Sequence, residues 1–284
     1  MEPLSADEIR RHVQAALAED IGSGDVTTLA TVLENATARA AMVAREPLVL
    51  AGLALAEAAF KELSPSIQFE RLAADGQTLA RGAVLARMQG AARAILTAER
   101  VALNFTQRLS GVATLTAQFV AAVQGTGAQI LDTRKTTPGW RRLEKYAVTC
   151  GGGRNHRAGL FDLVLIKDNH LAALRDEPPN AIAAAMRLAR EKFPKLQVEV
   201  EADTLAQVEQ AVAAGADIIL LDNMTTDQLR AAVKLVGGRA KTEASGGVNL
   251  STVRAIAETG VDFISVGAIT HSARAVDIAL DFEP

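Results

Sequence analysis

The chain has 284 residues and a formal net charge of -3, and 49% of its residues are hydrophobic, so it can bury a sizeable core in two domains or one barrel with an appendage. Only 4% of the residues are aromatic and the pI is about 5.9, which argues against a nucleic-acid-binding protein. The single Cys150 excludes an intrachain disulfide framework and a cysteine-cluster metal site. Because we find neither a signal peptide nor an apolar run of about 18 residues, we expect a cytoplasmic protein without a membrane span.

The first third of the chain combines helices with short strands. Residues 5–19 predict a helix, because an S-x-x-E capping box precedes a periodic apolar face. The Gly- and Asp-rich segment 19–28 predicts a loop. Strands with Gly or Pro breaks are expected within 36–50 and 67–90, with a helix at LALAEAAFKEL between them.

Residues 92–124 predict two helices that are separated near Ser110-Gly111. Glu99 and Arg100 project from the apolar surface of the first helix. On periodicity alone, the two side chains are interpreted as a surface salt bridge.

From residue 128 onward the chain repeats a strand, a polar strand end and a helix. The apolar runs are short and continuous, as in parallel strands that are buried on both faces, and the later units repeat every 21 residues or so, roughly as compact βαβ units do. This pattern favours an α/β barrel; an open doubly wound sheet is the alternative, although no GxGxxG follows a first strand. Strands are expected at 128–131, 163–166, 197–201, 217–221, 241–244 and 262–266, and helices at 140–149, 180–193, 204–214, 225–236 and 251–259.

Cations are concentrated between the strand at 128–131 and the helix at 180–193. Arg134 and Lys167 follow predicted buried strands, where an unpaired charge is costly, so an anionic ligand is the simplest reason for them. Barrel enzymes carry their chemistry at the carboxyl ends of the strands. We therefore expect further basic groups to join them there, namely Lys135, His156 and Arg157.

Not every basic residue of this segment is assigned to the site. Arg141, Arg142 and Lys145 are interpreted as a solvated helix face. His156 lies between two arginines, which disfavour a second positive charge, so a neutral hydrogen-bond donor is expected.

Glu201 and Asp222 end consecutive predicted strands and are expected side by side at the barrel mouth. Hard carboxylates suit Mg²⁺ when phosphates lie nearby, and they would stabilise a developing cation. Salt bridges to Lys167 or Arg134 are the structural alternative. Because Glu199 shares the parity of Glu201 along its strand, the sequence does not separate the two.

Small residues follow the two late strands at Ser245-Gly246-Gly247 and Val266-Gly267-Ala268. Such tips allow backbone N–H groups to approach a phosphate, as in the loops after the last strands of phosphate-binding barrels. A tight turn explains each tip equally well. The glycine run at 151–153 follows no strand and predicts a flexible connection.

The motifs together resemble the quinolinate phosphoribosyltransferase family, the carboxylating nicotinate-nucleotide pyrophosphorylases, along nearly the whole chain. The pairing of TRKTTPG with NHR and IKDNH is the most specific part. The matching blocks are EDIGSGDVTT at 19–28, ERVALNF at 99–105, DTRKTTPGWRRLEKYAV at 132–148, GGGRNHRAGLFD at 151–162, IKDNH at 166–170, EVEADT at 199–204, ILLDNM at 219–224, EASGGV at 243–248 and FISVGAITHS at 263–272.

The resemblance implies a reaction in which quinolinate attacks 5-phosphoribosyl-1-pyrophosphate with Mg²⁺ present. Pyrophosphate and CO₂ leave, and the product is nicotinate mononucleotide on the de novo route to NAD. It also implies an N-terminal α/β sandwich domain at 1–111, joined by the tail at 272–284, and an incomplete, TIM-like α/β barrel at 112–271.

The resemblance also implies the site residues. The quinolinate carboxylates would be held by Arg134, Lys135, His156 and Arg157, and Thr133 would be a further substrate-binding residue. The ribose, pyrophosphate and Mg²⁺ would face Lys167, Glu201 and Asp222, and the catalytic set would be these three with Lys135. The tips Ser245-Gly246-Gly247 and Val266-Gly267-Ala268 would cradle the 5′-phosphate.

Arg100 takes a different role under this resemblance. It would reach the site of a neighbouring subunit, which replaces the salt-bridge interpretation and requires a homodimer, alone or within a hexamer of three dimers. Alternatives outside this activity are a nicotinate-using relative, a binding protein without turnover, and a barrel aldolase or isomerase with Lys167 as a Schiff-base residue.

Overall fold

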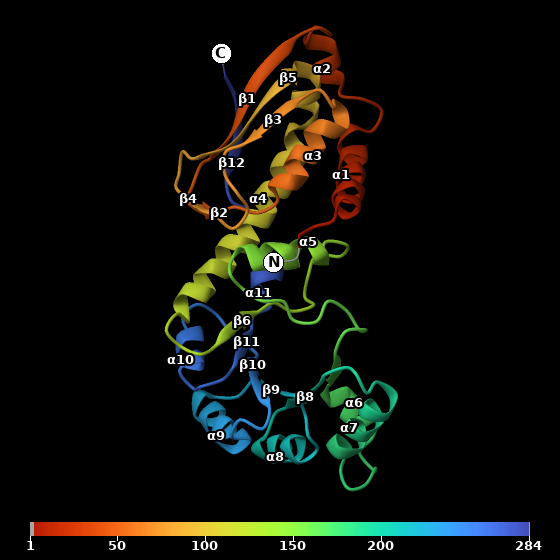
Figure 1. Cartoon of the computed structure of the whole chain (residues 1–284), viewed down its shortest axis with the longest axis vertical. Helices are drawn as coiled ribbons and strands as arrows, with labels where there is room; N and C mark the ends of the chain where they lie inside the picture. The colour runs from red at the N-terminus through yellow and green to blue at the C-terminus, as the bar shows by residue number, and fades with distance from the viewer. Residues whose placement is uncertain (1–2, 284) are drawn as a thin grey trace. The chain divides into compact units, whose positions relative to one another are not determined.

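A computed structural model describes residues 3–283 of the chain, which form two compact units. The first unit runs to Ala117 and also contains Thr137–Gly152 and the tail from Ser272; the second contains Gln118–Thr136 and Gly153–His271. Each unit has one main sheet, and both sheets can be followed in Figure 1. Within residues 3–283, every helix is too short or too polar to cross a bilayer.

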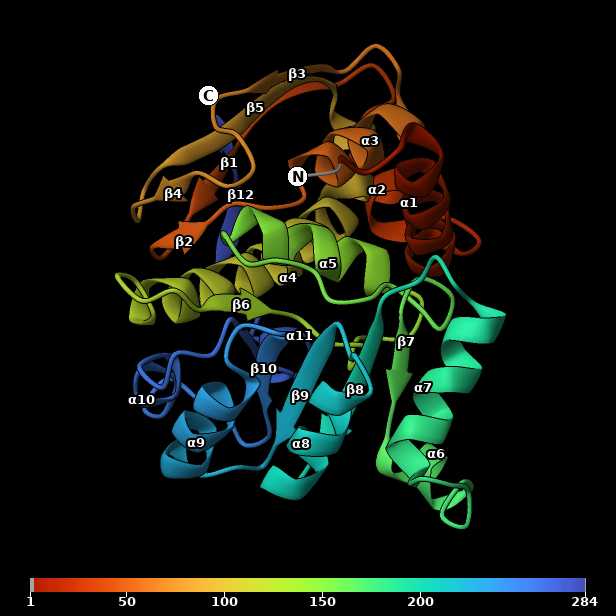
Figure 2. The ribbon, with the colours of Figure 1, turned by 60° about the horizontal axis from the view of Figure 1, so that its bottom comes forward.

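The first unit is an antiparallel sheet covered by helices on one side. Its strand order is β12-β1-β5-β3, and the pair β2-β4 forms a separate ribbon. Figures 1 and 2 show α3 and α4 on the same side of the main sheet, where Met42 and Phe60 are fully buried. The strands are β1 (Thr37–Ala44), β2 (Leu48–Val49), β3 (Gln68–Arg71), β4 (Thr78–Leu79), β5 (Val84–Ala91) and β12 (Ile278–Glu283), and the helices are α1 (Ala6–Ile21), α2 (Val26–Thr31), α3 (Leu53–Leu63), α4 (Ala92–Ala122, of which residues up to Ala117 belong to this unit) and α5 (Arg141–Cys150).

The prediction of two helices on either side of Ser110-Gly111 is wrong, because α4 is continuous through both residues. A Cβ at Gly111 would lie 1.9 Å from the carbonyl oxygen of Arg274, so the helix surface must be bare where the C-terminal tail crosses it. The Ser110 hydroxyl accepts a hydrogen bond from the N–H of Ala51 at 2.9 Å. Both small residues mark close packing and not a helix end.

Three further local predictions need correction. The expected loop at 19–28 is partly helical, since α1 extends to Ile21 and α2 begins directly after its cap, Asp25. Lys145 does not belong to a solvated face, because it is buried within the first unit. Gly151 is not part of a loose connection, since a Cβ there would lie 2.3 Å from the carbonyl oxygen of Ala113 on α4.

The second unit confirms the six predicted strands and the expected parallel barrel. The strand order is β6-β11-β10-β9-β8-β7, and every neighbouring pair is parallel. Because β6 and β7 stand at opposite edges, the ring of strands is incomplete. The strands are β6 (Gln129–Leu131), β7 (Val164–Ile166), β8 (Val198–Ala202), β9 (Ile218–Asp222), β10 (Lys241–Ser245) and β11 (Phe263–Ser265).

Helices cover the outside of this curved sheet, as Figure 2 shows for α7, α8 and α9. Four of these helices lie within the predicted ranges or close to them: α7 (Ala181–Lys192), α8 (Leu205–Ala213), α9 (Thr226–Val236) and α10 (Val253–Ala257). Two short helices were not expected, α6 (Asp168–Ala172) and α11 (Ala268–His271). Both begin directly after a strand end, where a single helical turn is too brief to give a periodic apolar pattern.

The free edge of β6 carries a short stretch of chain, residues 154–157, which we call the edge segment. Leu131 and Arg154 form an isolated parallel bridge, and the N–H of Arg154 donates to the carbonyl of Ile130 at 2.8 Å. The fully buried Asp132 accepts a hydrogen bond from the His156 N–H at 2.8 Å. These bonds hold His156 and Arg157 beside β6, at the gap in the ring.

Candidate active site

The carboxyl ends of the strands in the second unit surround a cavity of about 840 Å³. Parallel strands bring their ends to the same side of a barrel, so residues far apart in sequence meet there. The predicted site residues that line this cavity are Thr133, Arg134, Lys135, His156, Arg157, Lys167, Glu201, Asp222, Ser245, Gly246, Gly247, Gly267 and Ala268.

Two predicted site residues lie elsewhere. Val266 is buried, and its N–H donates to the carbonyl of Leu131, so this amide serves the sheet and does not face the cavity. Arg100 is an exposed residue of α4 in the first unit. Its expected salt bridge to Glu99 is absent among the ion pairs of the described residues, and burial raises the pKa of Glu99 despite the adjacent charge of Arg100.

One side of the cavity is strongly cationic. Arg157 is half-buried, and its pKa is lowered first by burial and then by the positive charge of Arg134. One Arg157 nitrogen donates to the carbonyl of Leu163 at 3.3 Å, which fixes the guanidinium. Two guanidinium groups that repel each other at a cavity wall are typical of a binding site for an anion.

The acidic side of the cavity holds Glu201 and Asp222 at the ends of the adjacent strands β8 and β9. The Lys167 ammonium forms an ion pair with Glu201. Burial raises the pKa of Asp222, and the negative charges of Glu201 and Asp203 raise it further, while Lys167 acts in the opposite direction. The structural alternative of a Lys167 salt bridge is therefore present, together with an excess of negative charge that favours a cation.

The tip after β10 has little space for side chains. A Cβ at Gly246 would lie 2.2 Å from Oδ1 of Asn223, and Gly246 has a φ of 97°. Asn223 itself has a φ of 54°, which Asn tolerates better than most residues. The turns after β9 and β10 therefore pack closely against each other, which brings their backbone near the cavity.

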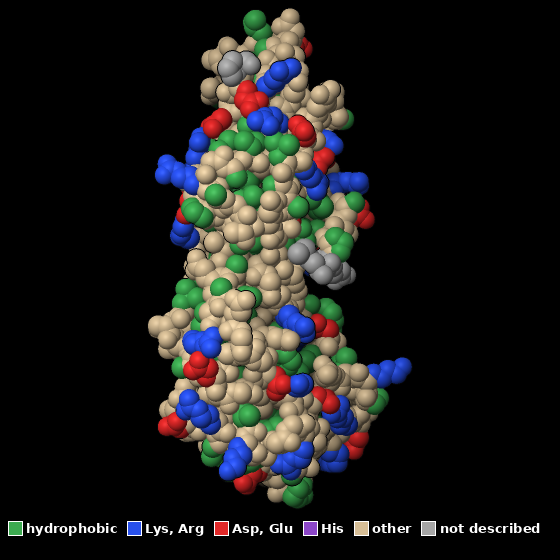
Figure 3. Space-filling view, turned by 60° about the vertical axis from the view of Figure 1, so that its left-hand side comes forward, with side chains coloured by type: hydrophobic (Ala, Val, Ile, Leu, Met, Phe, Trp, Pro, Cys, Tyr) green, Lys and Arg blue, Asp and Glu red, His purple; other side chains and the backbone are tan. Residues whose placement is uncertain are grey.

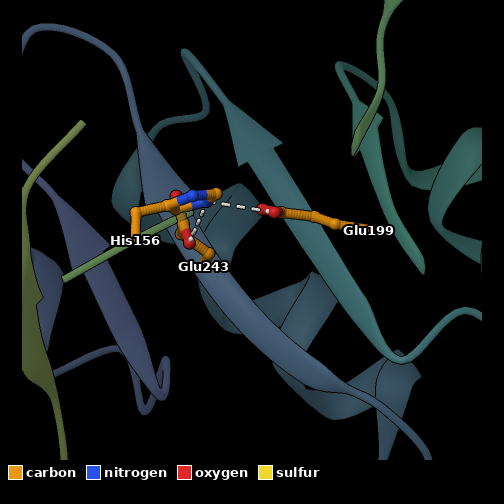
Figure 4. Close-up of side chains that lie close together, drawn as sticks. All are labelled: His156, Glu199 and Glu243. Carbon is orange, nitrogen blue, oxygen red and sulfur yellow. Dashed lines mark ion pairs between the residues drawn. The ribbon is translucent and has the colours of Figure 1, made fainter. Parts of the chain in front are cut away.

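Below the mouth, His156 lies between two buried glutamates, as Figure 4 shows. Its Nε2 is 3.0 Å from Oε2 of Glu199 on β8 and 3.5 Å from Oε2 of Glu243 on β10. Each glutamate precedes a cavity residue of its own strand by two positions, Glu201 and Ser245, so it occupies the next layer down inside the barrel. We call His156, Glu199 and Glu243 the floor cluster. Burial raises the pKa of Glu243 to about 8, and the charge of Glu199 adds to the effect.

The cavity has lining residues that the sequence did not assign to the site, among them Asn223, Glu243 and His271. Glu243 precedes Ser245 on β10 by two positions, as Glu199 precedes Glu201 on β8, and this shared spacing is a usable signal. His271 is on α11, four residues after Gly267, and a Cβ at Gly267 would lie 3.2 Å from its ring. No periodic pattern in the sequence indicates that this histidine turns back to the strand end.

Positive and negative side chains are mixed on the outer face that Figure 3 shows. On the face in Figure 3, Lys and Arg side chains alternate with Asp and Glu over the described residues. This face therefore lacks, among those residues, the extended positive field that nucleic-acid binding needs.

Comparisons with known proteins agree with the motifs. The family model "Quinolinate phosphoribosyl transferase, N-terminal domain" matches residues 25–110, and that of the C-terminal domain matches residues 112–281. A Mycobacterium leprae protein named nicotinate-nucleotide pyrophosphorylase [carboxylating] is 45% identical, with 97% of each chain covered. A Bacillus subtilis protein with the same name, marked as probable, is 44% identical over 93% of this chain and 89% of its own length.

Solved structures give the same answer. A nicotinate-nucleotide pyrophosphorylase from Francisella tularensis superposes with a TM-score of 0.93 at 41% identity, covering 99% of this chain and 98% of that one. NadC from Streptococcus pyogenes superposes with a TM-score of 0.94 at 39% identity over 100% of both chains. With both family models matched and whole-length relatives above 40% identity, the chain belongs to the quinolinate phosphoribosyltransferase family.

Proposed function

We propose that this chain transfers the phosphoribosyl group of 5-phosphoribosyl-1-pyrophosphate to quinolinate, releases pyrophosphate and CO₂, and forms nicotinate mononucleotide for NAD biosynthesis. The observation that carries the proposal is the cavity wall formed by Arg134, Lys135 and Arg157. These groups suit a dianionic pyridine dicarboxylate, because planar guanidinium forks match carboxylates. Membership of the family supports the same reaction.

In this proposal the cations hold the acid and the opposite wall holds the activated sugar. Thr133, Arg134, Lys135 and Arg157 grip the two carboxylates of quinolinate. Lys167 lines the cavity beside Glu201 and would meet the pyrophosphate. The backbone at Ser245-Gly246-Gly247, with Gly267 and Ala268, would receive the 5′-phosphate.

His156 supports the clamp in a way that differs from the expectation. The N–H of Arg157 donates to Nδ1 of His156 at 2.7 Å, and Nε2 faces the two glutamates. Both ring nitrogens therefore have protein partners. We propose that His156 fixes Arg157 instead of holding the substrate directly.

Glu201 and Asp222 fit a Mg²⁺ ion by their chemistry. Mg²⁺ prefers one or two carboxylates together with substrate phosphates, and the raised pKa of Asp222 beside Glu201 and Asp203 reflects a repulsion that a cation relieves. When bound, Mg²⁺ would neutralise the charge of the leaving pyrophosphate. We propose these two carboxylates as its ligands, directly or through water.

The assembly and the location are also proposals. Arg100 is exposed in the first unit, and we propose that it completes the site of a second subunit in a homodimer, alone or within a hexamer. The cytoplasmic location expected from the sequence stays a prediction.

A direct assay tests the function. Purified protein with quinolinate, 5-phosphoribosyl-1-pyrophosphate and Mg²⁺ should release pyrophosphate and CO₂ in equal amounts. Nicotinate should not replace quinolinate, because one carboxylate leaves half of the clamp unpaired. Turnover with nicotinate alone would identify a nicotinate-using transferase, and quinolinate binding in a calorimeter without turnover would identify a binding protein.

A further inference from the structure

The proposed reaction requires a proton for the ring carbon that loses CO₂. When quinolinate loses CO₂, the carbon–carbon bond breaks and its electron pair stays on the ring carbon. That carbon must take up one proton to give nicotinate mononucleotide. A suitable donor is protonated near neutral pH, is shielded from bulk solvent and has its acidic group at the cavity.

Glu243 has the position of such a donor. It lines the cavity, yet it is only 1% exposed. None of the four carboxylate oxygens of Glu199 and Glu243 receives a hydrogen bond of ordinary geometry from the described residues. Two buried carboxylates this close to one imidazole cannot both be ionised at low cost, so one of them is expected to carry a proton.

The hydrogen bonds of His156 show which of its two ring nitrogens carries the proton. A backbone N–H can only donate, so the bond from the Arg157 N–H to Nδ1 at 2.7 Å requires a lone pair on Nδ1. The ring proton is therefore on Nε2, which points to Glu199 and Glu243. The three residues also have the spacing of a metal site, but a protonated Nε2 cannot be a metal ligand.

From this geometry we propose that Glu243 donates the proton that replaces the lost carboxylate, and that His156 and Glu199 position it. The inference rests on the proposed function. In the step, the Glu243 O–H bond breaks, a C–H bond forms at the ring carbon, and Glu243 is left as a carboxylate. The Nε2–H of His156 stabilises that carboxylate until water returns a proton after the product leaves.

The groups that face Glu243 come from four parts of the barrel. They are Glu199 of β8, His156 of the edge segment, Lys167 after β7 and Ser265 of β11. Burial and Glu199 raise the pKa of Glu243, whereas His156, Ser265 and Lys167 lower it. The donor is therefore lost as the pH rises through about 8, so the rate of nicotinate mononucleotide formation should fall on the alkaline side.

The decisive variant is Glu243→Gln, which keeps the shape of the side chain and removes its proton. We expect single-turnover formation of nicotinate mononucleotide to fall by about 100-fold or more, while quinolinate affinity measured by calorimetry stays within about threefold of the unmodified protein. Glu70→Gln on the exposed strand β3 is the matched control and should leave both quantities unchanged.

An isotope experiment separates proton donation from a structural role. In equal parts of H₂O and D₂O, the hydrogen that enters the product ring records the group that delivers it. Glu243→Asp, which retains an acid, should be slow but keep the H/D ratio of the unmodified protein, and Glu243→Gln should change it. Glu199→Gln should slow turnover and keep the ratio, because Glu199 only positions the donor.

Three results would overturn the inference. One is Glu243→Gln with turnover and H/D ratio like those of the unmodified protein. Another is a loss of quinolinate affinity as large as the loss of rate. The third is a stoichiometric metal in the purified protein that His156→Ala releases. Failure of the unmodified protein to use quinolinate would instead reject the proposed function itself.

Discussion

Arg157 shows how the protein holds a charge in a costly place until a ligand arrives. Its guanidinium is half-buried, and its pKa is lowered by burial and by Arg134. The repulsion between these two cations is relieved when an anion enters between them. An anion that binds between the two guanidinium groups thus offsets their repulsion, and this offset adds to the binding free energy.

Arg157→Lys is expected to weaken quinolinate binding by about tenfold or more, because a point charge replaces a planar fork. Calorimetry with quinolinate measures the effect. Arg230→Lys on α9, where the arginine pairs with Asp227 at the surface, is the control and should bind normally. Equal affinities for both variants would contradict the assigned clamp.

The raised pKa of Glu243 also predicts how stability depends on pH. The folded protein holds this proton up to about pH 8, whereas the ordinary pKa is 4.5, so the folded state binds more protons within this window. The free energy of unfolding therefore falls as the pH rises through it. Glu243→Gln should remove this loss, so thermal unfolding should show a variant as stable as the unmodified protein at pH 4 and more stable near pH 9. A lower melting temperature near pH 9 would contradict the assignment.

At this scale the sequence identifies residue types better than residue roles. Arg134, Lys167, Glu201 and Asp222 were assigned to the cavity from their place after buried strands, and they line it. Glu199 was not separable from Glu201, because both point to the same face of β8. Their different partners distinguish them, His156 for Glu199 and Lys167 for Glu201, and a single sequence does not contain those contacts.

At the scale of elements, the barrel strands were predictable because a parallel strand that is buried on both faces appears in the sequence as a short, continuous apolar run. The break predicted at Ser110-Gly111 failed for a physical reason. A glycine in a helix can serve close packing as well as a helix end, and local sequence does not show which. Gly111 serves packing, since the carbonyl of Arg274 occupies the place of its missing side chain.

Gly111→Ala should therefore destabilise the protein by about 1–3 kcal/mol or more, because the added methyl group overlaps backbone that has no room to move. The control is Gly127→Ala, where a Cβ would meet nothing within 4 Å. Urea unfolding of both variants measures the difference. Equal midpoints would show that the tail of the first unit does not cross α4 as described.

At the scale of the whole molecule, the chain divides its proposed chemistry between two units. The cavity lies entirely in the second unit, and Arg100 lies in the first. If Arg100 serves another subunit, then two inactive variants can repair each other. The sequence alone suggested this only through the family resemblance, because an exposed arginine on a helix has no distinguishing pattern.

Arg100→Ala and Lys135→Ala should each be inactive alone. After the two proteins are mixed and allowed to exchange subunits, half of the dimers are mixed and one of their two sites is intact, so about a quarter of the unmodified activity should return. The assay is CO₂ release after mixing. Activity that stays at zero, with subunit exchange shown by mass spectrometry, would contradict a shared site.

The edge segment has a consequence for how the protein responds to heat. It is attached to β6 by one isolated bridge and the bonds around Asp132, whereas β8, β9 and β10 each have strands on both sides. Amide deuteration should thus enter at Arg154 well before it reaches the middle of the sheet. A bound dicarboxylic acid would hold Arg157 in place and slow amide exchange in the edge segment. Substrate should therefore protect the enzyme against thermal inactivation that begins with local unfolding of this segment.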